Sequence, residues 1–519
     1  MNSHPSKSLA VWASIFLAGW LTPGLSSALT RTVTDPADSG PGTLREAISI
    51  ATGGDEIVFS PALASATITL QTDQLSIDRD LTIDGSAAPG IEISGNDAFR
   101  IFRIDFGVTA DLKNLRITHG FSSDFDGGGA IDNLGTVRLD DCTVSDNSAV
   151  FGGAIDSDGT VELNRCQIVN NTASDSGGGI YNFGGTLTIT DSSLIGNQTG
   201  ESGGGINNEG GTVTVTNSSI ASNTADSQGG GIQSTSLGAQ VTLTHATVAG
   251  NMAGTLGGGI QISGGTLHLE NTIVGSNQAA GEPDISKDTL FGSPSISSTG
   301  AVLISDNSSV DSDFPASGTV GTPGAPLSAF LAPANDYGDG SLTRPPLPGS
   351  PAIGTAVLLG TTPALDQRGT ARPDRLLPDI GAVETFLWRN LPLIDTDLDN
   401  IDDRIEPALG LTVGADDSLA DTDQDGQTDG DEIGSMTHPF DATSLLQIDE
   451  YELTDPSLRL FRVRFPSFPG LGYSIEGDQN LDYQGPDRAI LGTTTATGFQ
   501  SEMTVILRPD RDFPRLVRD

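Results

Sequence analysis

The sequence predicts an all-β protein whose main body is a right-handed parallel β-helix, and three observations support this prediction. Six repeats between residues 121 and 280 each open with a glycine pair followed by isoleucine or by alanine and isoleucine. Apolar residues recur at fixed distances within each repeat, without a helical period. An asparagine closes every repeat, and successive asparagines lie 24 to 28 residues apart: Asn147, Asn171, Asn197, Asn223, Asn251 and Asn277. Repeats of this length indicate a solenoid.

The apolar residues lie ten, eight and three positions before each asparagine and predict short strands. In the first repeat they are Val137, Leu139 and Val144, and the other repeats carry valine, leucine or isoleucine at the same places. Residues two apart on a strand share one face, so each strand buries one face. A repeat of about 25 residues cannot cover that face by itself, so successive repeats must stack. In a parallel β-helix each repeat is one coil, and neighbouring coils lie about 4.8 Å apart.

The polar positions agree with this register. Each asparagine then lies above the next, and buried amides at strand spacing can form a hydrogen-bonded ladder. Arg138 lies over Glu162, and a second column alternates in sign through Asp141, Arg165 and Asp191. Opposite charges on neighbouring strands stabilise such a stack.

The first 28 residues predict a secretory signal. Lys7 supplies a positive charge, an apolar core runs from Leu9 to Leu21, and small residues precede a cleavage point near Leu29. No later stretch is apolar enough to cross a bilayer. We therefore expect a mature chain without a membrane span that is secreted or held at the bacterial cell surface.

The rest of the chain divides into five regions. The segment from Gly42 to Ile48 predicts a short helix that caps the open end of the solenoid. Arg368 and Arg372 are expected to form ion pairs that hold a second cap. Alternating apolar and polar residues near the end predict a small antiparallel β-sandwich. The expected regions are an N-terminal cap and first coils (29–120), regular repeats (121–280), degenerate coils and a C-terminal cap (281–390), an acidic connector (391–444) and the sandwich (445–519).

Two acidic loops in the connector predict bound calcium. Five carboxylates within twelve residues repel one another unless a cation lies between them. Hard oxygen ligands in a flexible loop favour Ca²⁺, which we expect to be structural. A solvated acidic linker is the alternative. Positions 1, 3, 5, 9 and 12 are Asp395, Asp397, Asp399, Asp403 and Glu406 in the first loop, and Asp421, Asp423, Asp425, Asp429 and Glu432 in the second.

Several of these motifs resemble known families. The repeats resemble the GGAI…N repeats of chlamydial polymorphic outer-membrane proteins and of many bacterial secreted β-helix proteins. The segments 44–47, 366–369 and 379–384 are similar to the opening and closing caps of such secreted proteins. The acidic loops resemble thrombospondin type 3 repeats and dockerin calcium loops. The resemblance implies a pectate lyase-like solenoid, a fold shared by adhesins, lyases and glycosidases, so it implies no single activity.

The charge balance excludes one class of partner. The chain carries 67 acidic and 25 basic residues, a net charge of −42. Nucleic acid binding needs a basic surface, so we expect no nucleic acid partner. An acidic surface instead favours divalent cations.

The nearest candidate for catalysis is a group of three aspartates. Asp132 is expected to lie over Asp156, with Asp158 two residues further along and His119 one coil earlier. Carboxylates about 5 Å apart must share a proton, a water molecule or a cation. Solvated turn residues are the alternative interpretation.

The remaining histidines and the two cysteines are not expected to form a site. His245 and His268 fall in outward columns, so we expect them at the surface. Cys142 and Cys166 share a column of otherwise small residues, which predicts two stacked core thiols. Export would permit a disulfide, but side chains in register point the same way, which is poor bonding geometry.

These observations favour a secreted or cell-surface adhesin or scaffold that binds an extracellular polysaccharide or a surface protein along the solenoid. A polysaccharide lyase or glycoside hydrolase acting in a groove is the alternative. A lyase needs an arginine or lysine base beside acidic calcium ligands. Lysine is absent between Asn114 and Lys287, and Arg138 and Arg165 already face carboxylates. A hydrolase needs a close pair of carboxylates.

Overall fold

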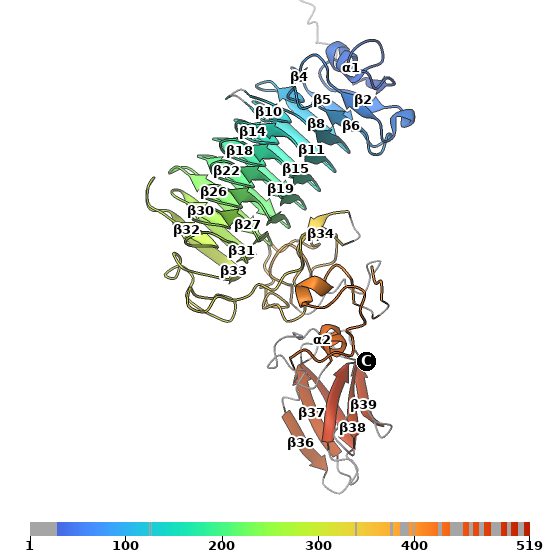
Figure 1. Cartoon of the computed structure of the whole chain (residues 1–519), viewed down its shortest axis with the longest axis vertical. Helices are drawn as coiled ribbons and strands as arrows, with labels where there is room; N and C mark the ends of the chain where they lie inside the picture. The colour runs from blue at the N-terminus through green and yellow to red at the C-terminus, as the bar shows by residue number, and fades with distance from the viewer. Residues whose placement is uncertain are drawn as a thin grey trace, which may run out of the picture.

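The computed structural model of the chain is an elongated solenoid followed by a connector and a group of antiparallel strands (Figure 1). It describes residues 28–123, 125, 127–337, 340–373, 377–384, 394–397, 399, 401–423 and 428–435, and six strands between 450 and 518. Residues 1–27 of the expected signal segment and Asp425 of the second acidic loop lie outside the described residues.

Three parallel sheets confirm the predicted right-handed parallel β-helix. Sheet A has two limbs, which each coil visits in turn. Limb 1 contains β1 (Thr30–Val33), β2 (Asp55–Phe59), β5 (Leu81–Asp84), β8 (Thr109–Lys113), β11 (Thr136–Asp140), β15 (Thr160–Asn164), β19 (Thr186–Thr190), β23 (Thr212–Thr216) and β27 (Gln240–Thr244). Limb 2 contains β3 (Thr67–Thr69), β6 (Glu92–Ser94), β9 (Arg116–Thr118), β12 (Thr143–Ser145), β16 (Gln167–Val169), β20 (Ser193–Ile195), β24 (Ser219–Ala221) and β28 (Thr247–Ala249). The long strands β31 (Thr266–Gly275) and β33 (Ser295–Ile304) span both limbs.

The other two sheets complete each coil. Sheet B contains β4 (Leu75–Ile77), β7 (Phe102–Ile104), β10 (Ile131–Asn133), β14 (Ile155–Ser157), β18 (Ile180–Phe183), β22 (Ile206–Glu209), β26 (Ile232–Thr235), β30 (Ile260–Ile262) and β32 (Ile285–Lys287). Sheet C contains β13 (Ser148–Ala149), β17 (Thr172–Ala173), β21 (Gln198–Thr199), β25 (Thr224–Ala225) and β29 (Met252–Ala253).

The register is the one that the repeats predict. Val137 pairs with Val161 in the neighbouring coil, and both side chains are fully buried. Arg138 pairs with Glu162 in the same ladder, and their side chains form an ion pair of 2.9 Å. The apolar columns therefore form one continuous core along the solenoid.

The closing asparagines form the expected ladder inside the solenoid. Asn171 donates from Nδ2 to Asn197 Oδ1 at 3.0 Å, and its own Oδ1 accepts from Asn147 Nδ2 at 2.9 Å. The same pattern continues to Asn277, which donates to Asp284 Oδ1 at 2.9 Å. Because every amide donates in the same direction, the last coil needs a residue that only accepts, and a carboxylate supplies it.

A second polar ladder inside sheet B is not predicted by the sequence analysis. Asn182 Nδ2 donates to Asn208 Oδ1 at 2.8 Å, and Asn208 Nδ2 lies 3.3 Å from Ser234 Oγ. Asn133 and Ser157 continue this row in the earlier coils. Buried polar side chains thus bond one another on two faces of the core, while Asn182 Oδ1 has no hydrogen-bond partner among the described residues.

Two features of each coil explain its residue usage. The corner between the limbs of sheet A has a left-handed backbone, with φ between 45° and 54° at Asn114, Asp141, Arg165, Asp191, Asn217, His245 and Asn271. Asparagine and aspartate tolerate this conformation better than most residues. In the glycine pairs, a Cβ on Gly178 would lie 2.4 Å from the carbonyl oxygens of Gln198 and Gly204, so only glycine allows the coils to stack.

Helix α1 (Leu44–Ile50) covers the N-terminal end of the solenoid (Figure 1), and the short 3-10 helix η1 (Pro61–Leu63) follows β2 in the chain. Thr43 caps α1 by accepting from the Glu46 amide, and the Glu46 carboxylate accepts from the Gly42 amide at 2.5 Å. These reciprocal bonds fix the start of the helix. Its residues Leu44, Ala47 and Ile48 are buried in the core.

A closing segment, defined here as residues 305–384, turns back and lies along limb 2. It contains β34 (Asn335–Asp336) and β35 (Leu342–Thr343). Gln367 Nε2 donates to Ser193 Oγ at 2.8 Å, and Ser219 Oγ donates to Gln367 Oε1 at 2.7 Å. Apolar residues of the segment pack on limb 2 of the last coils in a separate cluster that includes Ala249, Ile273, Leu331 and Ile380.

The connector and the last strands follow. The connector contains the 3-10 helix η3 (Glu406–Leu409) and α2 (Asp429–Ser435). Two antiparallel sheets follow: β36 (Glu450–Asp455), β37 (Leu460–Pro466) and β40 (Gln500–Ile506), and β38 (Gly472–Asp478), β39 (Ala489–Thr495) and β41 (Phe513–Arg518). Within the described residues, no helix has the length and apolar character needed to span a membrane.

Candidate functional sites

The three candidate catalytic aspartates lie together on sheet B. Asp132 in β10 pairs in register with Asp156 in β14, as expected, and Asp158 follows the end of β14. All three line a cavity of about 390 Å³, which we call the sheet-B cavity. Asp132 is only 6% exposed, so the interpretation as solvated turn residues is wrong for it. His119 is not among the residues that line this cavity.

The sequence did not predict that two arginines lie beside Asp132. Arg103 lies below Asp132 in register, and its Nη1 is 3.2 Å from Asp132 Oδ2. Arg100 Nη1 is 3.4 Å from the same oxygen, and Arg100 also bonds Gln74 Oε1 at 2.9 Å and Ser122 Oγ at 3.0 Å. The sequence did carry a sign of this contact, because Arg103 lies between the apolar residues Phe102 and Ile104, as expected for an outward-facing strand position. The longer, irregular coil between Arg103 and Asp132 hid their register.

The environment of Asp156 favours its protonated form. Burial is the main cause, and the charges of Asp132 and Asp158 add to it, raising the pKa of Asp156 to about 7. A carboxyl group with this pKa is part protonated at neutral pH, so it can donate as well as accept a hydrogen bond. Asp132, in contrast, lies beside two guanidinium groups.

Aromatic side chains form one wall of the sheet-B cavity. The ring centroids of Phe125 and Phe151 are 6.4 Å apart, and those of Phe151 and Tyr181 are 5.0 Å apart. Phe183 continues the row 6.3 Å from Tyr181. Phe125 is 77% exposed and Phe183 is 51% exposed, so the row is open to solvent. Tyr181 is held by a 2.6 Å hydrogen bond from its hydroxyl group to Glu209.

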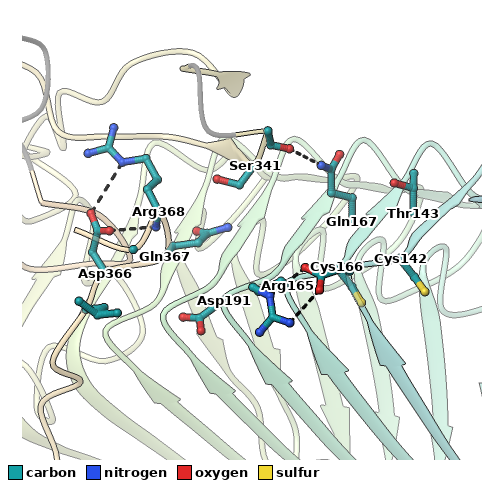
Figure 2. A pocket seen from close by; sticks show the side chains of 14 residues that line it. Cys142, Thr143, Arg165, Cys166, Gln167, Asp191, Ser341, Asp366, Gln367 and Arg368 are labelled. Atoms are coloured by element: carbon teal, nitrogen blue, oxygen red, sulfur yellow. Dashed lines mark hydrogen bonds and ion pairs between the residues drawn. The ribbon is translucent and has the colours of Figure 1, made fainter. Parts of the chain in front are cut away.

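A second cavity of about 500 Å³ lies between the corner column and the closing segment, and we call it the corner cavity (Figure 2). Arg165 lines it and is paired with Asp141 at 2.8 Å. Asp191 lies in the next coil, and burial raises its pKa above the ordinary value. On the opposite side, Gln167 Nε2 donates to the Gly340 carbonyl at 2.5 Å.

The two thiols behave as core residues. Cys142 and Cys166 are both buried and both free, and Figure 2 shows their side chains in neighbouring coils pointing the same way. Burial and the adjacent Cys166 raise the pKa of the Cys142 thiol well above its ordinary value. A buried thiol with a raised pKa is a poor nucleophile and a poor metal ligand.

The expectation of a surface position for His245 is wrong. His245 points away from its coil, but the closing segment covers it completely. Arg372 Nη1 donates to His245 Nδ1 at 2.8 Å and to Glu384 Oε1 at 2.7 Å. Burial, followed by the charge of Arg372, lowers the pKa of His245 to about 3, so the ring stays neutral. His268 is at the surface as expected. The expected ion pair of Arg372 is present: it joins Glu384, is fully buried, and lies within the closing segment.

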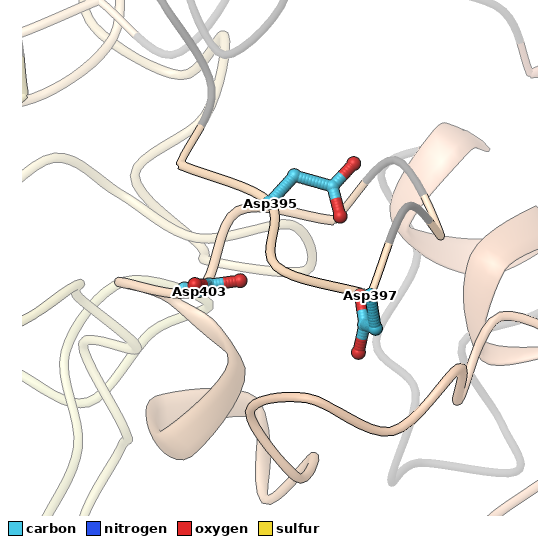
Figure 3. A group of neighbouring side chains, drawn as sticks. All are labelled: Asp395, Asp397 and Asp403. Carbon is cyan, nitrogen blue, oxygen red and sulfur yellow. The ribbon is translucent and has the colours of Figure 1, made fainter.

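The first acidic loop brings its carboxylates together in two overlapping groups. One oxygen from each of Asp395, Asp397 and Asp403 lies within 4.8 Å of the others (Figure 3), and the same holds for Asp397, Asp399 and Glu406. Glu406 is fully buried, and no donor among the described residues reaches either of its oxygens. Burial, then the charges of Asp397 and Asp399, raises the pKa of Glu406 to about 7. These residues fit a divalent cation, because the ion would supply the missing partner.

The position-9 aspartates also close their loops. Asp403 accepts from the amide of Thr396 at 2.9 Å and from its hydroxyl at 2.5 Å. Asp429 accepts from Thr422 in the same way, at 3.0 Å and 2.7 Å. The second loop places Asp421, Asp423, Asp429 and Glu432 within the described residues, and Glu432 is buried. Calcium binding by either loop stays a prediction.

Comparison with known proteins adds little beyond the fold. No protein-family model and no curated protein matches the sequence. Among solved structures, the chain is similar to one described as the crystal structure of pectate lyase Pel9A. The identity is 14% and the TM-score 0.41, over 70% of this chain and 98% of the other. A likeness at this level carries no statement about activity.

Proposed function

We propose that this protein is a secreted or cell-surface β-helix scaffold that binds a neutral glycan on sheet B, with structural Ca²⁺ in the connector. The observation that carries the proposal is the sheet-B cavity, where an open aromatic row lies beside three carboxylates and Arg103. Sugar rings present apolar C–H faces that pack on aromatic rings, and hydroxyl groups that bond carboxylates and guanidinium groups.

The charges of the cavity favour a neutral ligand. Asp132, Asp156 and Asp158 line it together with a single arginine, Arg103, whose guanidinium is already paired with Asp132. The whole chain carries a net charge of −42. A polyuronate would therefore be repelled at the site and on approach.

The aromatic row also suggests how the glycan lies. Phe125, Phe151 and Tyr181 come from successive coils, and their rings are separated by 6.4 and 5.0 Å. These separations follow the stacking of coils, about 4.8 Å per strand. A glycan chain lying along the solenoid axis would meet one ring after another.

Glycoside hydrolysis at the same cavity is the second candidate. The raised pKa of Asp156 favours it, because a carboxyl group protonated at neutral pH can act as a general acid beside a second carboxylate. Asp132, held by two arginines, would be that second carboxylate. A lyase is less favoured, because both nearby guanidinium groups are paired with Asp132 and neither is positioned as a base.

Replacing Phe151 with alanine is expected to weaken glycan binding about thirtyfold, since an aromatic anchor at the centre of a contact contributes about 2 kcal/mol. Titration calorimetry with neutral gluco-, manno- and xylo-oligosaccharides would measure the change, with oligogalacturonate as the anionic comparison. Reducing-end release from the same sugars would separate hydrolysis from binding.

Phe106→Ala is the matched control. Phe106 is 89% exposed and does not line the sheet-B cavity, so the same substitution there should leave binding unchanged. Equal losses in both variants, or no binding of any neutral glycan by the unaltered chain, would contradict the proposal. Tighter binding of oligogalacturonate would contradict the charge argument.

Glu406→Gln is expected to lower calcium affinity in the first loop at least tenfold, because a neutral amide replaces a buried charged ligand. Saturating Ca²⁺ at about 100 times its Kd should stabilise the connector by about 2.7 kcal/mol. Calorimetric titration of the metal-free protein measures the affinity, and thermal unfolding with and without Ca²⁺ measures the stabilisation. Glu201→Gln changes the charge equally at an exposed turn and should alter neither.

A further inference from the structure

The acidic loop and the closing segment share one apolar cluster. Ile401, Ile405 and Leu409 of the first loop and η3 pack against Ala332, Tyr337 and Leu347 of the closing segment. Ile433, in helix α2 at the end of the second loop, packs on the same cluster. The same short stretch therefore supplies apolar residues to this cluster and, through Asp399 and Glu406, carboxylates to the acidic group.

Arg404 adds a polar connection at the same place. It is paired with Asp402 at 2.5 Å, and its Nη1 donates to the Asp336 carbonyl at 3.0 Å. Its guanidinium also lies over the Tyr337 ring, 5.1 Å from the centroid. Tyr337 is fully buried and donates from its hydroxyl to the Pro333 carbonyl at 2.7 Å. The position of the 333–337 stretch thus depends on residues that lie between the carboxylates of the loop.

The same stretch is hydrogen-bonded to Gly340, which lines the corner cavity. The Gly340 amide donates to Asp336 Oδ1 at 2.9 Å, and the Gly340 carbonyl accepts from Gln167 in β16. Two residues further on, the Leu342 carbonyl accepts from Ser193 in β20 at 2.6 Å. Through Arg404, Asp336 and Gly340, hydrogen bonds therefore link the acidic loop to β16 of the solenoid.

We propose that Ca²⁺ in the first acidic loop acts as a latch that holds the closing segment against limb 2 and so forms the outer wall of the corner cavity. This inference rests on the calcium part of the proposed function and is independent of the glycan part. With the ion bound, Asp397, Asp399 and Glu406 converge on it. Ile401, Arg404 and Ile405 lie between these carboxylates in the chain, so they are then held against the closing segment. Without it, the buried carboxylates repel one another and separate. The apolar contacts and the Arg404 bonds then weaken together.

The consequence concerns access to Arg165 and Asp191. Both line the corner cavity, whose outer side is Gly340, Ser341 and the 365–369 stretch. The 365–369 stretch has its own buried bonds through Gln367 and Asp366. Among the described residues on this outer side, the Gly340–Ser341 wall is the part linked to the acidic loop through Asp336 and Arg404. The calcium concentration of the surroundings would therefore set how open this wall is, while the rest of the closing segment stays in place.

Hydrogen–deuterium exchange on the full-length protein tests the latch. Peptides covering 332–347 should exchange at least tenfold more slowly in 2 mM Ca²⁺ than in chelator, while peptides covering 136–145 of the solenoid and 364–372 of the closing segment should not change. Glu406→Gln should abolish the calcium effect on 332–347, and Glu201→Gln should preserve it. Mg²⁺ at the same concentration controls for ionic strength.

A second variant separates metal binding from the latch. Arg404→Ala removes the bonds to Asp336 and Tyr337 and leaves every predicted ligand in place. It should bind Ca²⁺ with little change in affinity and yet lose most of the protection of 332–347. Calcium binding by calorimetry without any change in exchange at 332–347 would overturn the latch and leave the calcium site standing. Absence of calcium binding to the unaltered protein would overturn both.

Discussion

Replacing Asn171 with glycine is expected to lower the free energy of unfolding by about 4 kcal/mol, because at least two buried hydrogen-bonding groups lose their partners at about 1–3 kcal/mol each. The Asn171 side chain accepts from the amide and the Nδ2 of Asn147 at 3.1 and 2.9 Å. It donates to the Val144 carbonyl and to Asn197 Oδ1, both at 3.0 Å. Urea denaturation followed by circular dichroism measures the change.

The neighbouring residue provides a matched control. Asn170 is exposed and has φ of 56°, a conformation that glycine adopts without strain, so Asn170→Gly should change stability by less than about 1 kcal/mol. Because each coil contacts only its neighbours, loss at Asn171 should be greatest in the two adjacent coils. Equal stability of the two variants would show that the ladder contributes little.

The regular coils could be predicted because their physics is local and repeated. Val137, Arg138 and Asn147 each lie over their equivalents in the next coil, and the positions counted back from each asparagine are the same in all six repeats. The residue that ends the asparagine ladder could not be predicted from the repeat. Asp284 follows Asn277 by seven residues and replaces the amide only once, so it belongs to no column.

Only the acidic residues of the sheet-B cavity could be predicted from the sequence. The register of Asp132 on Asp156 follows from the repeat. Arg103 and Arg100 come from an earlier coil of different length, and no periodic signal marks their approach to Asp132. Phe125 and Phe151 lie in turns between coils, where spacing says nothing about direction. The acid group was therefore visible in the sequence, while the cations and the aromatic wall needed the fold.

The contacts between the closing segment and the solenoid could not be predicted from the sequence for a related reason. His245 lies in an outward column, and outward residues of a solenoid are exposed unless a distant segment covers them. Arg372, 127 residues later, makes that contact. Segments so far apart have no shared period. The acidic loop differs, because its carboxylates lie within twelve residues, and sequence alone predicts that they converge.

Glycan affinity is expected to fall about tenfold for each pH unit above 7, because one pKa unit corresponds to about 1.36 kcal/mol. The pKa of Asp156 is raised to about 7. Below that pH the carboxyl is protonated and donates to a sugar hydroxyl; above it, the carboxylate ionises beside Asp132 and Asp158 and the donor is lost. Calorimetric titration between pH 5.5 and 9 measures the profile.

The free energy of unfolding should also fall as pH rises. Between about pH 4 and 7 the folded chain keeps the Asp156 proton, whereas the unfolded chain has lost it. The contribution of Asp156 to folding stability therefore decreases as pH rises through that window.

Asp156→Asn decides between a binding and a catalytic role for this proton. An amide keeps a donor at every pH, so the variant should bind the glycan with affinity that no longer depends on Asp156 ionisation. If the cavity hydrolyses glycans, the same variant should bind and fail to cleave, since an amide cannot act as a general acid. Asp97→Asn, at an exposed residue with φ of 52°, should keep the pH profile of the unaltered chain. A flat profile from pH 6 to 9 in the unaltered protein would remove Asp156 from the site, because its protonation could then make no contact with the ligand.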